Sequence, residues 1–216
     1  MDLEPHPFTI AFVAGVTLTR WTTAWAERFP RVPLAFLPID PAAQVAVLDD
    51  GRADLSFGRL PIDGDHLSVI PLYGETTVVV VPKQHPVSLF ETVTLDDLVG
   101  EDRVPHSLSV EDAIELVAAG GGILVIPQSI ARLHARKDVV SRPVTDAAES
   151  RVAIAWLAER TTPQIEAFVG IVRGRTARSS RSGMPPTAVP ARKPPPPRRL
   201  AEPRKSVKRK KPRQGR

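Results

Sequence analysis

Residues 8–58 read FTIAFVAGVTLTRWTTAWAERFPRVPLAFLPIDPAAQVAVLDDGRADLSFG, and two kinds of pattern alternate along them. Phe8–Ala14, Leu34–Ile39 and Ala53–Gly58 are apolar and rich in strand-forming residues, as expected of buried strands. A helical pattern lies between the first two of these segments, and a second one starts at Pro41, between the last two. The order strand, helix, strand, helix, strand predicts an α/β fold with a mainly parallel sheet.

The first helical pattern presents one apolar face, formed by Leu18, Trp21, Trp25 and Phe29. We expect Thr17 to cap this helix and Pro30 to stop it. Pro41 suits the first turn of the next helix, and Gly51 suits its end.

The pattern continues along the chain with more strands and helices. We expect strands over Leu67–Leu72, Thr76–Pro82, Ile123–Ile126, Val139–Val144 and Arg151–Leu157. We expect a helix capped by Ser109 and running through Ala118 with Ala113, Leu116 and Val117 inward, a helix through about Ala135, and a last helix over Thr162–Val172. Gly120-Gly121-Gly122 follows a helix and precedes a strand, the reverse of a dinucleotide-binding loop, and is interpreted as a helix end.

Charge divides the chain into two parts. The tail, from Arg178 to Arg216, holds 14 Lys or Arg against one acid, a net charge of +13, and nine of the 23 prolines. The body, from Met1 to Ala177, carries 15 Lys or Arg and 23 Asp or Glu, a net charge of −8. A body of that length can bury a sizeable core. The tail, 178–216, lacks apolar periodicity, so we expect it to be disordered.

Several classes of protein are excluded or disfavoured. The chain has no cysteine, which excludes disulfides, thiolate zinc sites and a cysteine nucleophile. Its five histidines form no HxxxH or HExxH pair, and no GxSxG elbow is present. We therefore expect no metal, no cofactor and no enzyme. No secretory signal or membrane-length apolar run is visible, which favours a cytoplasmic protein, with association to the nucleoid if the tail binds DNA.

Four segments, in order, carry a family resemblance: Glu27–Pro30 (ERFP), Val47–Arg59 (VLDDGRADLSFGR), Pro71 through Pro86 with Glu75 and VVVVPKQHP, and Leu116–Pro127 (LVAAGGGILVIP). Together they resemble the effector-binding domain of LysR-type transcriptional regulators over roughly residues 8–172. The resemblance implies a type 2 periplasmic-binding-protein-like α/β fold in residues 7–175. Its two lobes would have mostly parallel sheets, lobe I at 7–70 and 140–175 and lobe II at 72–138.

By the same resemblance, a small organic anion of the aromatic or dicarboxylic class would bind between the lobes. The candidate effector-binding residues are Gly15, Val16, Thr17, Ile39 and Arg59. The turn 15–17 precedes a helix, whose N–H groups and hydroxyl suit an anion, although an ordinary N-cap explains it equally. Arg59 ends a strand and can bind a carboxylate through two hydrogen bonds; alternatively, it is solvated or pairs with Asp63.

The chain departs from the family pattern in two ways. No winged helix-turn-helix precedes the first strand, and only about twenty residues separate Leu98 from Val117, where relatives carry a further strand and helix. The main hypothesis is therefore a sensing module without its own helix-turn-helix. The alternative is an interaction or scaffold protein with a vestigial cleft, which partners full-length relatives or nucleic acid. As protein partners we expect a second copy of the chain, in a homodimer, or a full-length relative, in a heterodimer.

The basic tail is the candidate contact for DNA. Its cations are Arg198, Arg199, Arg204, Lys205, Lys208, Arg209, Lys210, Lys211 and Arg213. Such runs bind phosphate backbones by releasing counterions, with little sequence selectivity. A tail that only improves solubility is the alternative.

Overall fold

The structure is a computed structural model that describes residues 7–105 and 107–174. The strands are β1 (Phe8–Val13), β2 (Leu34–Ile39), β3 (Leu55–Arg59), β4 (Leu67–Glu75), β5 (Thr77–Pro82), β6 (Leu124–Pro127), β7 (Val139–Pro143) and β8 (Ser150–Leu157). The α-helices are α1 (Thr19–Arg28), α2 (Ala46–Asp49), α3 (Val110–Ala118), α4 (Gln128–Leu133) and α5 (Pro163–Val172). Short 3-10 helices are η1 (Pro41–Ala43), η2 (Pro86–Leu89), η3 (Asp96–Leu98) and η4 (Ala158–Arg160). The α/β class predicted from the sequence is confirmed.

The first sheet has five strands in the order β2-β1-β3-β8-β4. β1 pairs in parallel with β2 and β3, as the alternating pattern of residues 8–58 predicts. β8 then lies antiparallel between β3 and β4. This sheet is therefore mixed.

The second sheet has three strands in the order β6-β5-β7, and both pairings are antiparallel. The prediction of mostly parallel sheets is wrong for this part of the chain. Its central strand reads Val78–Val81 and is buried on both faces, so it lacks the alternation of a typical antiparallel strand. A continuous apolar run reports burial on two sides and does not determine strand direction.

The chain passes from the first sheet to the second, and later returns to the first, further along the sequence than expected. β4 pairs with β8 as far as Glu75, so the first sheet extends beyond residue 70. β7 pairs with β5 and belongs to the second sheet, although residues from 140 on were assigned to lobe I. The elements place lobe I at residues 7–75 and 150–174, and lobe II at 77–144.

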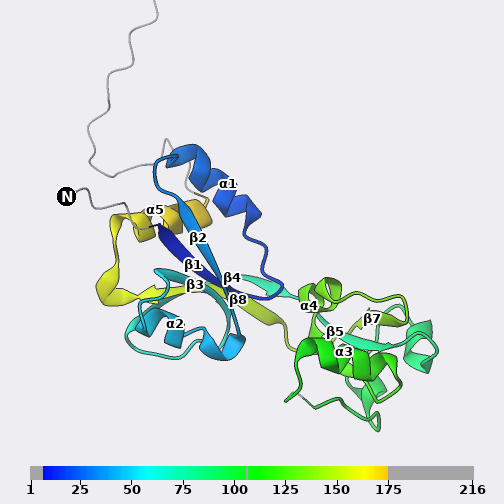
Figure 1. The fold of residues 1–216 in the computed structure, drawn as a ribbon. Coiled ribbons are helices and arrows are strands. Elements are labelled where there is room, and N and C mark those ends of the chain that lie inside the picture. The colour runs from blue at the N-terminus through cyan, green and yellow to red at the C-terminus, as the bar shows by residue number, and fades with distance from the viewer. Residues whose placement is uncertain (1–6, 106, 175–216) are drawn as a thin grey trace, which may run out of the picture. The chain divides into compact units, whose positions relative to one another are not determined.

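Helices cover both faces of the five-stranded sheet (Figure 1). α1 and α5 pack on one face, where Trp21, Trp25 and Phe168 are buried beside Phe57 of β3. α2 covers the other face with its buried Val47 and Leu48. The edges that remain are β2 and β4.

Helices and 3-10 turns also sandwich the three-stranded sheet. Val78 and Val80 face α3 and α4, whereas Val79 and Val81 face the segment that contains η2 and η3. The alternation of β5 between two covered faces explains why all four valines are at most 2% exposed.

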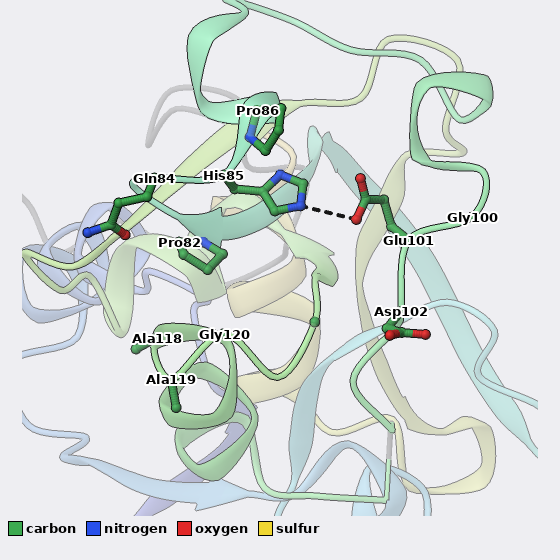
Figure 2. A pocket seen from close by; sticks show the side chains of 11 residues that line it. Pro82, Gln84, His85, Pro86, Gly100, Glu101, Asp102, Ala118, Ala119 and Gly120 are labelled. Carbon is green, nitrogen blue, oxygen red and sulfur yellow. Dashed lines mark hydrogen bonds and ion pairs between the residues drawn. The ribbon is translucent and has the colours of Figure 1, made fainter.

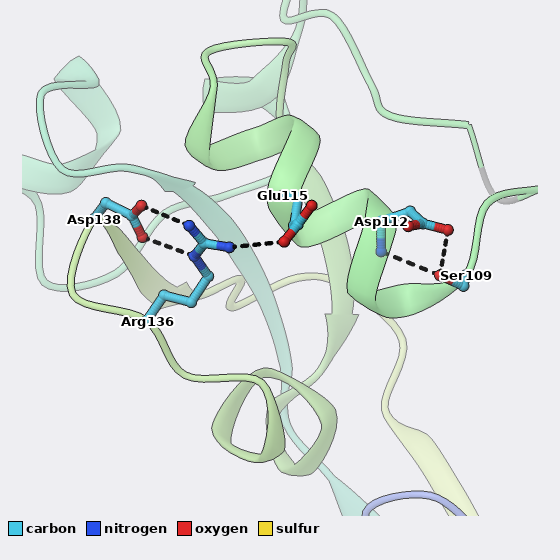
Figure 3. Close-up of polar contacts among 5 residues, drawn as sticks. All are labelled: Ser109, Asp112, Glu115, Arg136 and Asp138. Atoms are coloured by element: carbon cyan, nitrogen blue, oxygen red, sulfur yellow. Dashed lines mark hydrogen bonds and ion pairs between the residues drawn. The ribbon is translucent and has the colours of Figure 1, made fainter.

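The helix ends test the predicted caps. Ser109 accepts a hydrogen bond from the Asp112 N–H and caps α3, as predicted; Figure 3 shows this contact. Thr17 does not cap the first helix, because α1 begins two residues later after Leu18, which makes no side-chain cap. We expected Leu116 to face inward, but it is 37% exposed. Ile114 is buried in its place.

No helix among the described residues is long and apolar enough to cross a membrane.

Candidate functional site

The Arg59 guanidinium, at the end of β3, gathers contacts from three other parts of the chain. Its Nε lies 3.0 Å and its Nη2 2.9 Å from Glu75 Oε2, at the end of β4. Nη1 donates to the Ala14 carbonyl oxygen at 2.9 Å, and Nη2 lies 3.2 Å from Ser129 Oγ on α4. The side chains of Arg59 and Glu75 are only 13% and 7% exposed. Arg59 thus joins residues of both lobes in a partly buried polar cluster.

Gly15, in the turn between β1 and α1, lies close to Arg59 and Ser129. Its φ of +83° is a left-handed conformation that favours glycine. A Cβ there would lie 2.6 Å from Ser129 Oγ and 3.1 Å from Arg59 Nη2. Glycine is therefore required both for the turn and for the close approach of α4.

The remaining predicted site residues are not among the partners of the Arg59 guanidinium. Val16 is 8% exposed and packs into the aromatic core of the first sheet, so its side chain does not face a cleft. Thr17 is exposed, and Ile39 is partly buried against the core. Asp40, which could repel an anion, accepts the Ala42 N–H at 2.8 Å and caps η1.

Sequence reasoning missed two side chains that contact Arg59. We expected Asp63 as an alternative partner, but Glu75 holds that place, because β3 and β4 both pair with β8 and Arg59 reaches Glu75 across that intervening strand. Ser129, the second residue of α4, was not identified from the sequence as a contact of Arg59. The sequence did contain a signal for both contacts, because Glu75 is a carboxylate at the end of a strand and Ser129 is a hydroxyl at the start of a helix.

The electrostatics of the cluster reach Tyr73 on β4. Burial raises the pKa of the Tyr73 phenol above its ordinary value of 10.0. The negative charge of Glu75 acts in the same direction, whereas the positive charge of Arg59 opposes it. Tyr73 therefore stays a neutral phenol beside the ion pair at physiological pH.

A separate hollow of about 550 Å³ lies in the second lobe, shown in Figure 2. His85, Glu101 and Asp102 line it together with the end of α3. His85 Nε2 lies 3.1 Å from Glu101 Oε2, and His85 Nδ1 accepts the Val87 N–H. His85 therefore caps η2, which is a structural role.

Within residues 7–105 and 107–174, no three His, Asp or Glu side chains are grouped so that they could hold a metal ion. The nine basic tail residues predicted to contact nucleic acid lie outside the described residues.

A family model described as the LysR substrate binding domain matches residues 6–107 and 102–177. The chain belongs to this family. The expected resemblance is thereby confirmed, together with the two-lobed α/β fold that it implied.

Two curated relatives are transcriptional regulators. The HTH-type transcriptional regulator CatR of Pseudomonas putida is 32% identical over 124 residues, which are 44% of this chain and 42% of CatR. The HTH-type transcriptional regulator AlsR of Bacillus subtilis is 23% identical over 211 residues, covering 83% of this chain and 70% of AlsR. The match to CatR spans less than half of that relative's length.

Solved structures of low identity share the fold. The effector-binding domain of a BenM variant superposes with a TM-score of 0.67 at 24% identity, covering 78% of this chain and 94% of that chain. The BenM effector-binding domain with its effector benzoate gives 0.65 at 23% identity, covering 79% and 94%. An OxyR mutant of Corynebacterium glutamicum gives 0.65 at 20% identity, covering 78% and 64%.

Proposed function

We propose that this LysR substrate-binding domain senses a small organic anion, of the aromatic or dicarboxylic class, beside Arg59 and the Gly15 turn. The observation that carries the proposal is the convergence of both lobes on one guanidinium, through Glu75 and Ser129. Benzoate, the effector in the BenM structure, is an anion of this class. CatR and AlsR are named as regulators, which favours sensing over catalysis.

The pairing of Arg59 sets a condition on such binding. Its guanidinium already contacts a carboxylate, a carbonyl and a hydroxyl. A ligand carboxylate would compete with Glu75 for the edge of the guanidinium that binds two oxygens. It would also break the Ser129 contact, since Nη2 is shared between Glu75 and Ser129. Binding would then shift the second lobe relative to Arg59, which is how a ligand selects one of two conformations.

Thermal-shift screening tests this proposal with benzoate and a set of small dicarboxylates. A true ligand at 100 times its Kd stabilises the wild type by about 2.7 kcal/mol. Arg59→Ala should lose that stabilisation. Arg52→Ala is the matched control, because Arg52 is an exposed arginine beside Asp50 on the surface. Failure of every anion to stabilise the wild type would refute sensing of this class.

The scaffold role is the second candidate, and the contacts that the Arg59 guanidinium already makes with Glu75, Ala14 and Ser129 favour it. If Glu75 permanently occupies the guanidinium, the cleft needs no ligand and the domain acts through partners. Affinity purification of the tagged chain, followed by identification of co-purified LysR-type relatives, tests this role. A purified chain that is monomeric and free of partners, yet stabilised by a carboxylate, would contradict it.

The basic tail supports a further part of the proposal, contact with DNA. The 14 Lys or Arg between Arg178 and Arg216 are enough to release many counterions from a duplex. We expect the affinity of the full chain for DNA to fall by about 10³-fold between roughly 50 and 200 mM salt. Truncation after Ala177 should abolish binding. Equal affinity with and without the tail would refute the contact.

A further inference from the structure

Gln44 reaches the site from the short segment between η1 and α2. Its Oε1 accepts the Arg59 N–H at 3.0 Å, and its Nε2 donates to the Arg59 carbonyl oxygen, also at 3.0 Å. The same Nε2 lies 3.1 Å from the Pro61 carbonyl oxygen. One carboxamide therefore satisfies both backbone polar groups of Arg59.

This double contact takes the place of strand pairing on the β1 side of Arg59. β1 pairs with β3 only as far as Phe57, whereas β8 pairs with β3 on the other side as far as Arg59. Beyond Phe57, the backbone of β3 would have unpaired groups on the β1 side. A buried N–H or C=O without a partner is unfavourable, so the Gln44 carboxamide completes the ladder at Arg59.

Gly58 makes this arrangement possible. A Cβ at Gly58 would collide with Gln44 Oε1 and lie 3.1 Å from its Cδ. The backbone of Gly58 is buried, and its missing side chain is the space that the carboxamide fills. The SFGR stretch thus contains, next to the arginine, the glycine that the Gln44 contact requires.

We propose that Gln44 is a positioning residue for Arg59. It makes no hydrogen bond to the guanidinium, but it fixes the backbone from which the guanidinium reaches Glu75, Ala14 and Ser129. The carboxamide suits this task because it both accepts and donates without adding charge. A carboxylate at the same place would bond the N–H, repel the two carbonyl oxygens and place a negative charge near an anion site.

Gln44→Met tests the proposal, because methionine has a similar length and makes none of the three hydrogen bonds. The first measurement is the ¹H–¹⁵N resonance of Arg59 Nε–H in the ligand-free protein. In the wild type we expect a shifted, exchange-protected signal, since Nε donates to Glu75. In Gln44→Met the signal should move toward that of free arginine. Gln84→Met, the same change at an exposed glutamine, is the matched control.

The second measurement is benzoate affinity, and this part rests on the proposed function. We expect Gln44→Met to weaken benzoate binding about tenfold, which corresponds to about 1.4 kcal/mol. Gln44→Glu keeps the acceptor for the Arg59 N–H but repels the two carbonyl oxygens and adds a negative charge, so its benzoate affinity should fall at least as far as that of Gln44→Met. It serves as the second variant if Gln44→Met fails to fold.

The outcomes separate the two proposals. If the wild type does not bind benzoate, the result counts against sensing of that anion. The Arg59 Nε–H resonance still decides the role of Gln44. A lower Tm with an unchanged Arg59 Nε–H signal would show a merely structural glutamine and overturn the inference.

Discussion

The two lobes bury different kinds of side chain. In the first lobe aromatic residues interlock across one face of the sheet, with ring centroids 5.2 Å apart for Phe8 and Trp25 and 5.0 Å apart for Trp21 and Phe57. The cores of the second lobe contain only valine, alanine, leucine and isoleucine. Aromatic side chains bury about 150–250 Å² each, so each contact in the first lobe removes more surface from water. We infer that the first lobe holds most of the stability and that the second opens more easily.

The Arg59–Glu75 pair of the first lobe and the Arg136 pairs of the second lobe differ in burial. In the second lobe Arg136 bridges Asp138 and Glu115 (Figure 3), but these side chains are 40–66% exposed. Such surface pairs are worth roughly 0–1 kcal/mol. The Arg59–Glu75 pair, by contrast, is buried where the chain leaves the first sheet. Exposed pairs add little to the second lobe, so its aliphatic core must hold it together.

Phe168→Ala should have the largest effect. Phe168 is fully buried on α5 and contacts the rings of Phe8, Trp25 and Phe57. Its truncation should cost about 3–5 kcal/mol of unfolding free energy, measured by urea denaturation. Phe90→Ala, at an exposed phenylalanine of the second lobe, is the control and should stay within about 0.5 kcal/mol. A smaller loss for Phe168→Ala than for any single aliphatic truncation in the second lobe would break the comparison.

Ile114→Ala should have the next largest effect, at the lower end of the roughly 2–5 kcal/mol for a buried isoleucine. Its neighbours are small side chains that can close part of the cavity. Amide hydrogen exchange should show protection lost in β5 and β6 while β1 and β3 remain protected. Leu116→Ala, on the exposed side of the same helix, is the control. Uniform loss across both sheets would mean that the lobes unfold as one.

The sequence pattern predicted the first lobe better than the second. Residues 8–58 alternate between strand and helix periods, and local patterns are enough to give their parallel pairing. The run Val78–Val81 carries no such information, since burial on both faces removes the alternation that marks an antiparallel strand. Strand direction in the second lobe depends on β6 and β7, which lie far from β5 along the chain and beyond the reach of local patterns.

The candidate site shows the same limit. Arg59 and the Gly15 turn were identifiable, because an arginine at a strand end and a glycine before a helix have recognisable chemistry. Their partners were not, because Glu75 reaches Arg59 through the β4–β8 ladder and Ser129 through the packing of α4. The place of Val16 in the turn did not indicate that its side chain packs into the core. Single residues were predictable, and their pairing required the tertiary structure.

The two capping residues offer a smaller and more local comparison. Thr162 accepts the Ile165 N–H and caps α5 in the first lobe, and Ser109 does the same for α3 in the second. Each alanine substitution should cost about 1 kcal/mol. Thr162→Ala should lower the global unfolding free energy, whereas Ser109→Ala should mainly raise the exchange of second-lobe amides. Ser109→Thr keeps the hydroxyl and is the control. Identical exchange patterns for the two alanine variants would contradict separate opening.

The smallest expected effect is a pH dependence confined to the second lobe. The Thr94 N–H and hydroxyl each donate to Asp97 Oδ2 at 2.7 Å. The backbone bond first, and the hydroxyl second, lower the pKa of Asp97 below its ordinary value of 3.8. A carboxyl with a lowered pKa in the folded state stabilises the fold above its unfolded pKa and loses that contribution as pH falls through the folded pKa.

The Tm difference between wild type and Asp97→Asn should therefore be present at neutral pH and shrink as the pH is lowered past 3.8. The site is exposed, so the difference should be small. Exchange of the amides around η3 should follow the same pH course, while first-lobe amides should not. Asp96→Asn, at the neighbouring exposed acid, is the control. A Tm difference that grows in acid, or one that appears equally in β1 and β3, would show that this loop is coupled to the aromatic core, and the separation of the two lobes would then fail.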